Sequence, residues 1–228
     1  MPVDKNLELL APVAARLATS REEFVLVGGA VVGLLLTDPA SETPRPTDDV
    51  DVIVEVTSQA DYQLRLVPEL HRLGFSEDIE ATTICRWLVD GIKVDVMPTD
   101  SSILGFSNRW YDLAIRTAST RSLGRHTIRV ISAPCFIATK LEAFRARGDD
   151  DHYGSHDLED ILAVIDGRAE LAGEVAAAPD DLREYVAREI ATLLANDDFL
   201  NALPGHTRDL GRAAVVLRRL HDLAALDR

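Results

Sequence analysis

Two stretches of the chain, 24-FVLVGG-29 and 49-DVDV-52, carry most of the information about its fold. The first reads as a short apolar strand that ends at a pair of glycines. The second alternates polar and apolar residues, and side chains alternate between the two faces of a strand. Asp49 and Asp51 are therefore predicted to share one face, while the valines between and after them point into a core.

Two carboxylates on the same face of a strand repel each other, at a cost of several tenths to about 1 kcal/mol. Such a pair is usually tolerated where a cation lies between its members. A hard divalent ion that prefers oxygen ligands suits this position best, so Mg²⁺ is the expected ion and Mn²⁺ the alternative. The pair predicts a metal site rather than a purely structural strand.

The composition is that of a soluble globular protein of 228 residues, with 46% hydrophobic and 27% charged residues. This length allows one large domain or two small ones. We expect two closely packed lobes: an α/β lobe over 1–132 and a helical bundle over 133–228. The longest apolar run, 25–36, is broken by glycines and too short to span a bilayer. No signal-peptide pattern begins the chain, so we expect a cytoplasmic protein with no membrane partner.

The formal charge of −14 argues against binding nucleic acid over the whole surface, because such binding depends on neutralising phosphates. The charge is uneven, however. The stretch 109–147 contains eight basic and two acidic residues. Either it forms a solvated face or it is the region that binds phosphates.

Hydrophobic periodicity and turn residues predict the order of elements along the chain. The expected helices and strands are a helix over 7–17, a strand over 24–27, a helix to about 36, a proline-rich loop over 39–46, a strand over 49–56, a helix over 60–73, hairpin strands over 83–89 and 92–97, a helix over 109–116, a strand pair within 119–131, and then helices that begin at 134, 155 and 179 and a last one over 208–226.

A third carboxylate follows from the hairpin. Asp90-Gly91 is a strong signal for a two-residue type I′ turn. With that turn, Asp95 lies on the polar face of the second strand and Arg86 lies directly across from it. This contact is either a plain cross-strand salt bridge, which the residues alone slightly favour, or part of a functional site.

The pair Gly28-Gly29 lies between a strand and a helix. Glycines there allow backbone N–H groups to approach an anion at the start of the helix. Taken alone, the same pair is more typical of a tight strand-to-helix turn than of an anion site.

The order of these features resembles the polymerase beta type nucleotidyltransferase superfamily, in which a Gly-Gly or Gly-Ser turn is followed by Asp-x-Asp and a later carboxylate. Within it, Arg45-x-Thr47-x-Asp49-Val50-Asp51, 140-KLEAFR-145 and 157-DLEDI-161 look like the AbiEii/AbiGii toxin family, which includes the MenT toxins. The resemblance covers roughly residues 20–166. It implies an α/β (α+β) polymerase beta-like fold with a small mixed sheet, followed by a helical lobe that contributes to the active site.

The resemblance also implies site residues. Asp49, Asp51 and Asp95 would be catalytic and would hold two Mg²⁺ ions, and Lys140 with Asp157 would complete the catalytic set. The implied nucleotide-binding residues are Gly28, Gly29, Arg45, Thr47, Lys140, Arg145 and Asp160.

Lys140 is also singled out by its place on the helix that begins near Pro134. It falls inside the apolar stripe of that helix, where an unpaired ammonium would cost several kcal/mol. It therefore either extends its amine to solvent or meets a carboxylate or phosphate. On the following helix Asp157 flanks the core face while Asp160 lies nearly opposite it, so Asp157 is the expected partner.

The expected function is transfer of a nucleoside monophosphate from an NTP to an acceptor hydroxyl. By the resemblance, the protein would be a toxin of a toxin–antitoxin system that acts on tRNA, with a cognate antitoxin as partner. The alternatives are a protein hydroxyl or a small molecule as acceptor, as in antibiotic-modifying nucleotidyltransferases, and a non-catalytic nucleotide-binding module.

Overall fold

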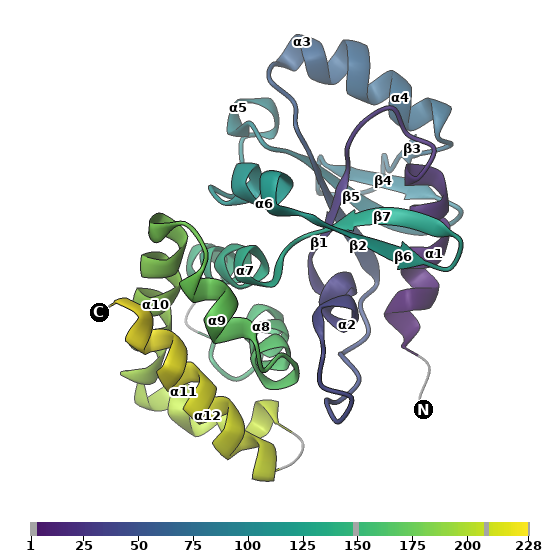
Figure 1. Cartoon of the computed structure of the whole chain (residues 1–228). Helices are drawn as coiled ribbons and strands as arrows, with labels where there is room; N and C mark the ends of the chain where they lie inside the picture. Colours follow the sequence, from purple (N-terminus) through teal and green to yellow (C-terminus); the bar gives the residue numbers. More distant parts are fainter. Residues whose placement is uncertain (1–3, 148–150, 208–209, 228) are drawn as a thin grey trace. The chain divides into compact units, whose positions relative to one another are not determined.

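The computed structural model describes residues 4–147, 151–207 and 210–227, which belong to two compact units (Figure 1). The α/β unit comprises residues 1–33 and 45–132. The helical unit comprises residues 34–44 and 133–228.

The α/β unit contains a sheet with short helices between its strands. Its elements are α1 (Lys5–Leu17), β1 (Val25–Val27), the 3₁₀-helix η1 (Gly29–Val31), β2 (Asp49–Val54), α3 (Gln59–Asp61), the π-helix η2 (Tyr62–Leu66), α4 (Val67–Arg72), β3 (Ser76–Glu77), β4 (Arg86–Val89), β5 (Ile92–Pro98), α5 (Ser101–Leu104), α6 (Tyr111–Thr117), β6 (Ser119–Leu123) and β7 (His126–Val130). Helix α2 (Val32–Leu35) crosses from the α/β unit to the helical unit.

The sheet has seven strands in the order β3-β4-β5-β2-β1-β7-β6. The pairs β2–β5 and β1–β7 are parallel and the other neighbours are antiparallel, so the sheet is mixed, as the sequence predicts. The alternating valines of β2 are completely buried at positions 50 and 52. Because side chains alternate along the strand, Asp49 and Asp51 lie on the other face.

The β4–β5 hairpin sets the register on one side of β2. Asp90 and Gly91 both have positive φ, at 51° and 80°, as a type I′ turn requires. Val89 pairs with Ile92, and the register continues to Arg86 opposite Asp95. The two-residue turn expected from the sequence is therefore confirmed.

The helix expected over 60–73 differs in its centre. Residues 59–72 are helical, but Tyr62–Leu66 form a π-helix before α4 begins. Pro68, near the start of α4, has no N–H to donate to the preceding turn. A local widening just before a proline removes the need for that hydrogen bond.

The helical unit contains α7 (Ala133–Arg147), α8 (His156–Gly167), α9 (Leu171–Ala176), α10 (Asp180–Leu194), α11 (Asp197–His206), α12 (Leu210–Ala224) and the 3₁₀-helix η3 (Ala225–Asp227). Ser155 caps α8 by accepting a hydrogen bond from Leu158 N–H, as expected. Helix α11 was not expected from the sequence. Pro204 lies inside it and Gly205 near its end, and both residues weaken a helical pattern.

Residues 34–44 pack with the helical unit although they lie far from it in sequence. The backbone N–H groups of Thr37 and Asp38 both donate to the carbonyl of Gly167 at 2.9 Å. Arg212 donates to Asp38 at 3.0 Å and to Asp166 at 2.8 Å. From the sequence, these residues were expected in the N-terminal lobe. Local patterns do not reveal contacts with segments that are more than a hundred residues away.

In the described part of the chain, we find no helix whose length and apolar character would let it cross a membrane.

Glu69 of α4 is a buried carboxylate that ties α4 to the end of α1. It accepts hydrogen bonds from Arg72, from Arg21 N–H at 2.7 Å and from Ser20 at 3.2 Å. The hydrogen bonds from Arg72 lower the pKa of Glu69 from 4.5 to about 2, against the opposing effect of burial.

We expect Glu69→Gln to lower the free energy of unfolding at neutral pH by about 1–3 kcal/mol, because it removes charge-assisted hydrogen bonds. The folded-state pKa is depressed, so the carboxylate's contribution is complete above pH 4.5 and is lost as the pH falls toward about 2. The difference between wild type and variant, measured by urea unfolding, should shrink through that window. Exposed Glu80 provides the control Glu80→Gln; a pH-independent Glu69→Gln effect would contradict this account.

Candidate active site

Three carboxylates lie on one face of two neighbouring strands. Asp49 and Asp51 are two residues apart on β2, and Asp95 on β5 is the register partner of Asp51. Residues paired across parallel strands point to the same side of a sheet, so all three side chains share a face. Asp95 is the most buried of them, with 8% of its surface exposed.

Arg86 of β4 links two of these carboxylates. Its Nε and Nη2 donate to the two oxygens of Asp95, both at 2.8 Å, and Nη2 also donates to Asp49 Oδ2 at 3.0 Å. The hydrogen bonds to Asp95 raise the pKa of Arg86 further above its usual value and outweigh the effect of burial. The cross-strand salt bridge considered from the sequence is therefore present and extends to Asp49.

Gly28 brings the backbone against the third carboxylate. It has φ +71°, and a Cβ placed on it would lie 1.8 Å from Asp51 Oδ2. Val27, just before it, is the register partner of Asp51 across β1 and β2. Both the conformation and the close approach therefore require glycine, and the start of η1 at Gly29 lies beside Asp51.

Asn6, which the sequence did not single out, holds the segment before β2 in place. Thr47 Oγ1 donates to Asp49 Oδ1 at 3.0 Å. Asn6 of α1, which is 1% exposed, accepts from Thr47 N–H at 3.0 Å and donates to the carbonyl of Arg45 at 2.9 Å. The signal for Asn6 was its spacing: as a polar residue, it lies four positions before the buried Leu10 on the apolar face of α1.

Lys140, in the helical unit, contacts two carboxylates, whereas the sequence predicted one. Its Nζ is 2.9 Å from Asp157 Oδ1 and 2.8 Å from Asp160 Oδ2. Burial lowers the pKa of Lys140, but the charges of Asp160 and Asp157 more than compensate, so the net pKa is raised. The expected contact with Asp157 is present.

The sequence-based placement of Asp160 away from the core was wrong. Asp160 is 1% exposed, because α8 is buried around most of its circumference rather than along one stripe. A helical pattern that assumes one solvated face does not apply to such a helix.

The remaining predicted residue, Arg145 on α7, is exposed and donates to Glu189 of α10 at 2.8 Å. The α/β unit thus brings together Gly28, Thr47, Asp49, Asp51 and Asp95, and the helical unit brings together Lys140, Asp157 and Asp160. The first set belongs to the α/β unit and the second to the helical unit.

Comparison with known proteins identifies the fold. No protein-family model and no curated protein matches the sequence. Among solved structures, an antigenic nucleotidyltransferase-like protein from Paracoccidioides brasiliensis superposes with a TM-score of 0.52 at 19% identity, over 87% of this chain and 93% of that one. The chain has a nucleotidyltransferase-like fold.

Two further solved structures match with lower scores. The antibiotic-resistance factor ANT(2'')-Ia superposes with a TM-score of 0.48 at 14% identity, over 85% of this chain and 96% of that one. JHP933 from Helicobacter pylori also has a TM-score of 0.48, at 11% identity, over 99% of this chain and 93% of that one.

The fit of the carboxylates to Mg²⁺ depends on Arg86. Among residues 4–147, 151–207 and 210–227, no group of three or more His, Cys, Asp or Glu side chains is arranged to hold a metal ion. By chemistry the three aspartates suit a hard cation, and each carboxylate oxygen that accepts from Arg86 keeps a second lone pair. A divalent ion at Asp49 and Asp95 would have to use these remaining lone pairs or displace the guanidinium group of Arg86.

We expect Gly28→Ala to destabilise the α/β unit by more than the roughly 1–2 kcal/mol of left-handed strain alone, because the new methyl group meets Asp51. Gly91→Ala is the matched control, since Gly91 also has positive φ, at +80°, but has open space around its Cβ position. Both are measured by chemical denaturation. Equal losses would contradict a close contact between Gly28 and Asp51.

We expect Arg86→Gln to lower the unfolding free energy by about 2–4 kcal/mol, because it leaves Asp49 and Asp95 without the guanidinium group that donates to both. Arg16→Gln is the control: Arg16 also binds one aspartate, Asp90, but both side chains are nearly half exposed, so its loss should cost less than about 1 kcal/mol. Thermal and urea unfolding compare the two. A loss in Arg86→Gln no larger than the control would show that the aspartates do not need a cation.

Proposed function

We propose that the chain is a nucleotidyltransferase that transfers a nucleoside monophosphate from an NTP to an acceptor hydroxyl. The observation that carries this proposal is the alignment of Asp49, Asp51 and Asp95 on one face of β2 and β5, beside the Gly28 turn. The nucleotidyltransferase-like fold supports the same class of reaction.

In this proposal Asp49 and Asp51 hold Mg²⁺, and Asp95 shares a second ion. Bound Mg²⁺ supplies positive charge to the triphosphate and lowers the pKa of the acceptor hydroxyl. The glycine turn, in which Gly28 lies against Asp51, offers its backbone to the phosphates.

The acceptor oxygen attacks the α-phosphorus, the bond from that phosphorus to the pyrophosphate oxygen breaks, and pyrophosphate leaves. Asp95 takes the hydroxyl proton, with Arg86 holding its carboxylate in place. If a metal ion replaced Arg86 as the partner of Asp49, the Arg86 Nη2 group that now donates to Asp49 would be able to donate to phosphate oxygens instead.

The resemblance adds further nucleotide-binding residues to the proposal. It assigns that role to Gly28, Gly29, Arg45, Thr47, Lys140, Arg145 and Asp160, with Asp157 completing the catalytic set. The hydrogen bond from Thr47 to Asp49 is consistent with such a role for Thr47, since it fixes a proposed metal ligand.

For the acceptor, the resemblance to the AbiEii/AbiGii family favours tRNA, and with it a cytoplasmic toxin that has a cognate antitoxin. A small-molecule acceptor is the second candidate, and the pairing of the basic stretch 109–147 favours it. Within that stretch Lys140 is buried between two aspartates, and Arg129 is paired with Glu23. Fewer of these cations are left for a polyanion than the sequence indicates.

The test is transfer of label from each [α-³²P]NTP with Mg²⁺, using total RNA and hydroxyl-bearing small molecules as acceptors. Asp49→Asn and Asp51→Asn should lower the rate at least about 100-fold, because they remove proposed ligands of Mg²⁺, whose positive charge would offset that of the phosphates. Asp48→Asn is the matched control: Asp48 is the exposed neighbour of Asp49 and should tolerate the change.

The outcomes separate the candidates. Label in RNA of tRNA size supports the toxin, and label in a small molecule supports the second candidate. Binding of MgATP without release of pyrophosphate, whichever acceptor is added, would favour a non-catalytic nucleotide-binding module. Transfer that survives Asp49→Asn, or that Asp48→Asn abolishes equally, would overturn the assignment.

A further inference from the structure

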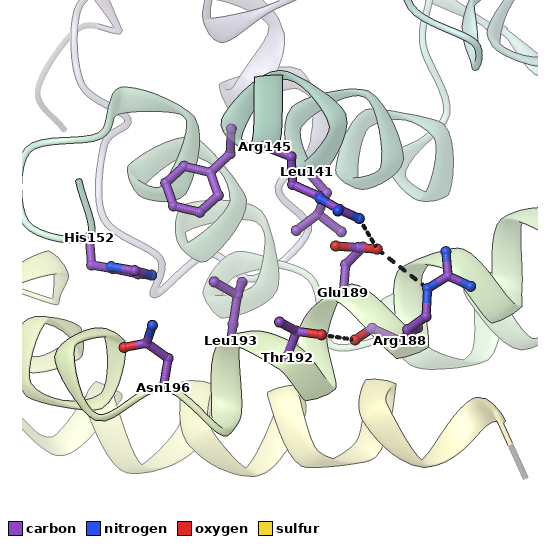
Figure 2. Close-up of a pocket in the computed structure, with 9 residues that line it drawn as sticks. Leu141, Arg145, His152, Arg188, Glu189, Thr192, Leu193 and Asn196 are labelled. Atoms are coloured by element: carbon purple, nitrogen blue, oxygen red, sulfur yellow. Dashed lines mark hydrogen bonds and ion pairs between the residues drawn. The ribbon is translucent and has the colours of Figure 1, made fainter. Parts of the chain in front are cut away.

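A second candidate site lies wholly within the helical unit. A cavity of about 610 Å³ is lined by residues of α7 and α10, by His152 of the segment before α8 and by Asn196, the N-cap of α11 (Figure 2). This volume falls in the range of small-molecule pockets. The lining residues are Leu141, Phe144, Arg145, His152, Arg188, Glu189, Thr192, Leu193 and Asn196.

One end of the pocket is cationic. Arg145 Nη1 lies 2.8 Å and Arg188 Nε 3.5 Å from the same oxygen of Glu189. Glu189 is 6% exposed, whereas the side chains of Arg145 and Arg188 are 62% and 56% exposed. One buried carboxylate thus positions two guanidinium groups, each of which keeps further N–H donors, and the local charge is +1 in a chain of net charge −14.

The other end contains a buried histidine with free ring nitrogens. His152 is 5% exposed, and its ring packs edge-on against Phe144 and Phe199, with centroids 5.6 and 6.3 Å away. Its backbone carbonyl accepts from His206, but no described residue gives its ring nitrogens a hydrogen-bond partner. Figure 2 shows the ring directed toward the space beside Leu193 and Asn196.

The ring nitrogens of His152 are not fully buried, so a ligand in the cavity has access to them as a hydrogen-bond donor and acceptor. Asn196 adds a second polar group there, since its oxygen caps α11 and its amide nitrogen is left for other contacts. Between the two ends the wall is apolar, formed by Leu141, Phe144 and Leu193.

We infer that this pocket binds a small organic anion: a carboxylate, sulfonate or phosphomonoester joined to an aromatic or aliphatic body. The anionic group lies at Arg145 and Arg188, and the body packs on Phe144 and Leu193. A polar group of the ligand reaches His152. Every residue of this pocket belongs to the helical unit, and Arg145 is the one lining residue that also appears in the proposed nucleotide-binding set.

The test uses two fluorescent probes with the full chain. 8-Anilinonaphthalene-1-sulfonate carries an anion on an aromatic body, and N-phenyl-1-naphthylamine is the same body without the charge. The sulfonate should bind saturably and at least fivefold more tightly than the neutral probe. Arg145→Gln and Arg188→Gln should each weaken sulfonate binding at least fivefold and leave the neutral probe unchanged.

Arg183→Gln is the matched control, since Arg183 is another arginine of α10 but pairs with Asp180 and does not line the pocket. Near-UV circular dichroism confirms that each variant is folded. NMR of the histidine rings adds a second readout, in which the signal assigned to His152 should shift as the sulfonate binds.

Three results would overturn the inference. Equal affinity for the two probes would show that charge is not recognised. Unchanged sulfonate binding in both arginine variants would place the probe elsewhere. Loss of binding in Asp49→Asn, with Arg188→Gln unaffected, would assign the probe to the α/β unit, whereas failure of nucleotidyl transfer alone leaves this inference standing.

Discussion

One guanidinium group holds the α/β unit's acidic face together. Asp49, Asp51 and Asp95 are brought onto that face by the pairing of β2 with β5, and Arg86 offsets the resulting charge through three hydrogen bonds. Without a cation, the same strand pairing would gather three mutually repelling groups in a partly buried place. The chain therefore supplies its own cation for two of the three aspartates that the strand register gathers.

The central part of this arrangement is predictable from local rules. Alternation of valine and aspartate assigns the two faces of β2, and Asp90-Gly91 fixes a turn that brings Arg86 opposite Asp95. These rules involve neighbouring residues or a two-residue loop, so little conformational freedom intervenes between the pattern and the geometry. The helical second half follows from the same patterns, whereas the mixed sheet was expected from the family resemblance.

What the sequence does not reveal depends on contacts between distant segments. Asn6 forms hydrogen bonds with the backbone of Arg45 and Thr47, about forty residues away in sequence. The contact of Lys140 with a second carboxylate depends on the burial of α8 on most of its sides. Likewise, Arg86 on β4 extends across β5 to donate a hydrogen bond to Asp49 on β2. In each case a tertiary partner, rather than the local pattern, determines where the side chain lies.

The allocation of residues 34–44 to the helical unit has a covalent consequence. The backbone passes between the two units three times, near 33, 44 and 132, instead of once. A truncation after Ser132 would not yield an intact α/β unit: it would leave the stretch that bonds to Gly167 and Arg212 as an unanchored insertion between β1 and β2. Dissecting this protein into halves therefore requires replacing that stretch with a short linker, not merely choosing a cut site.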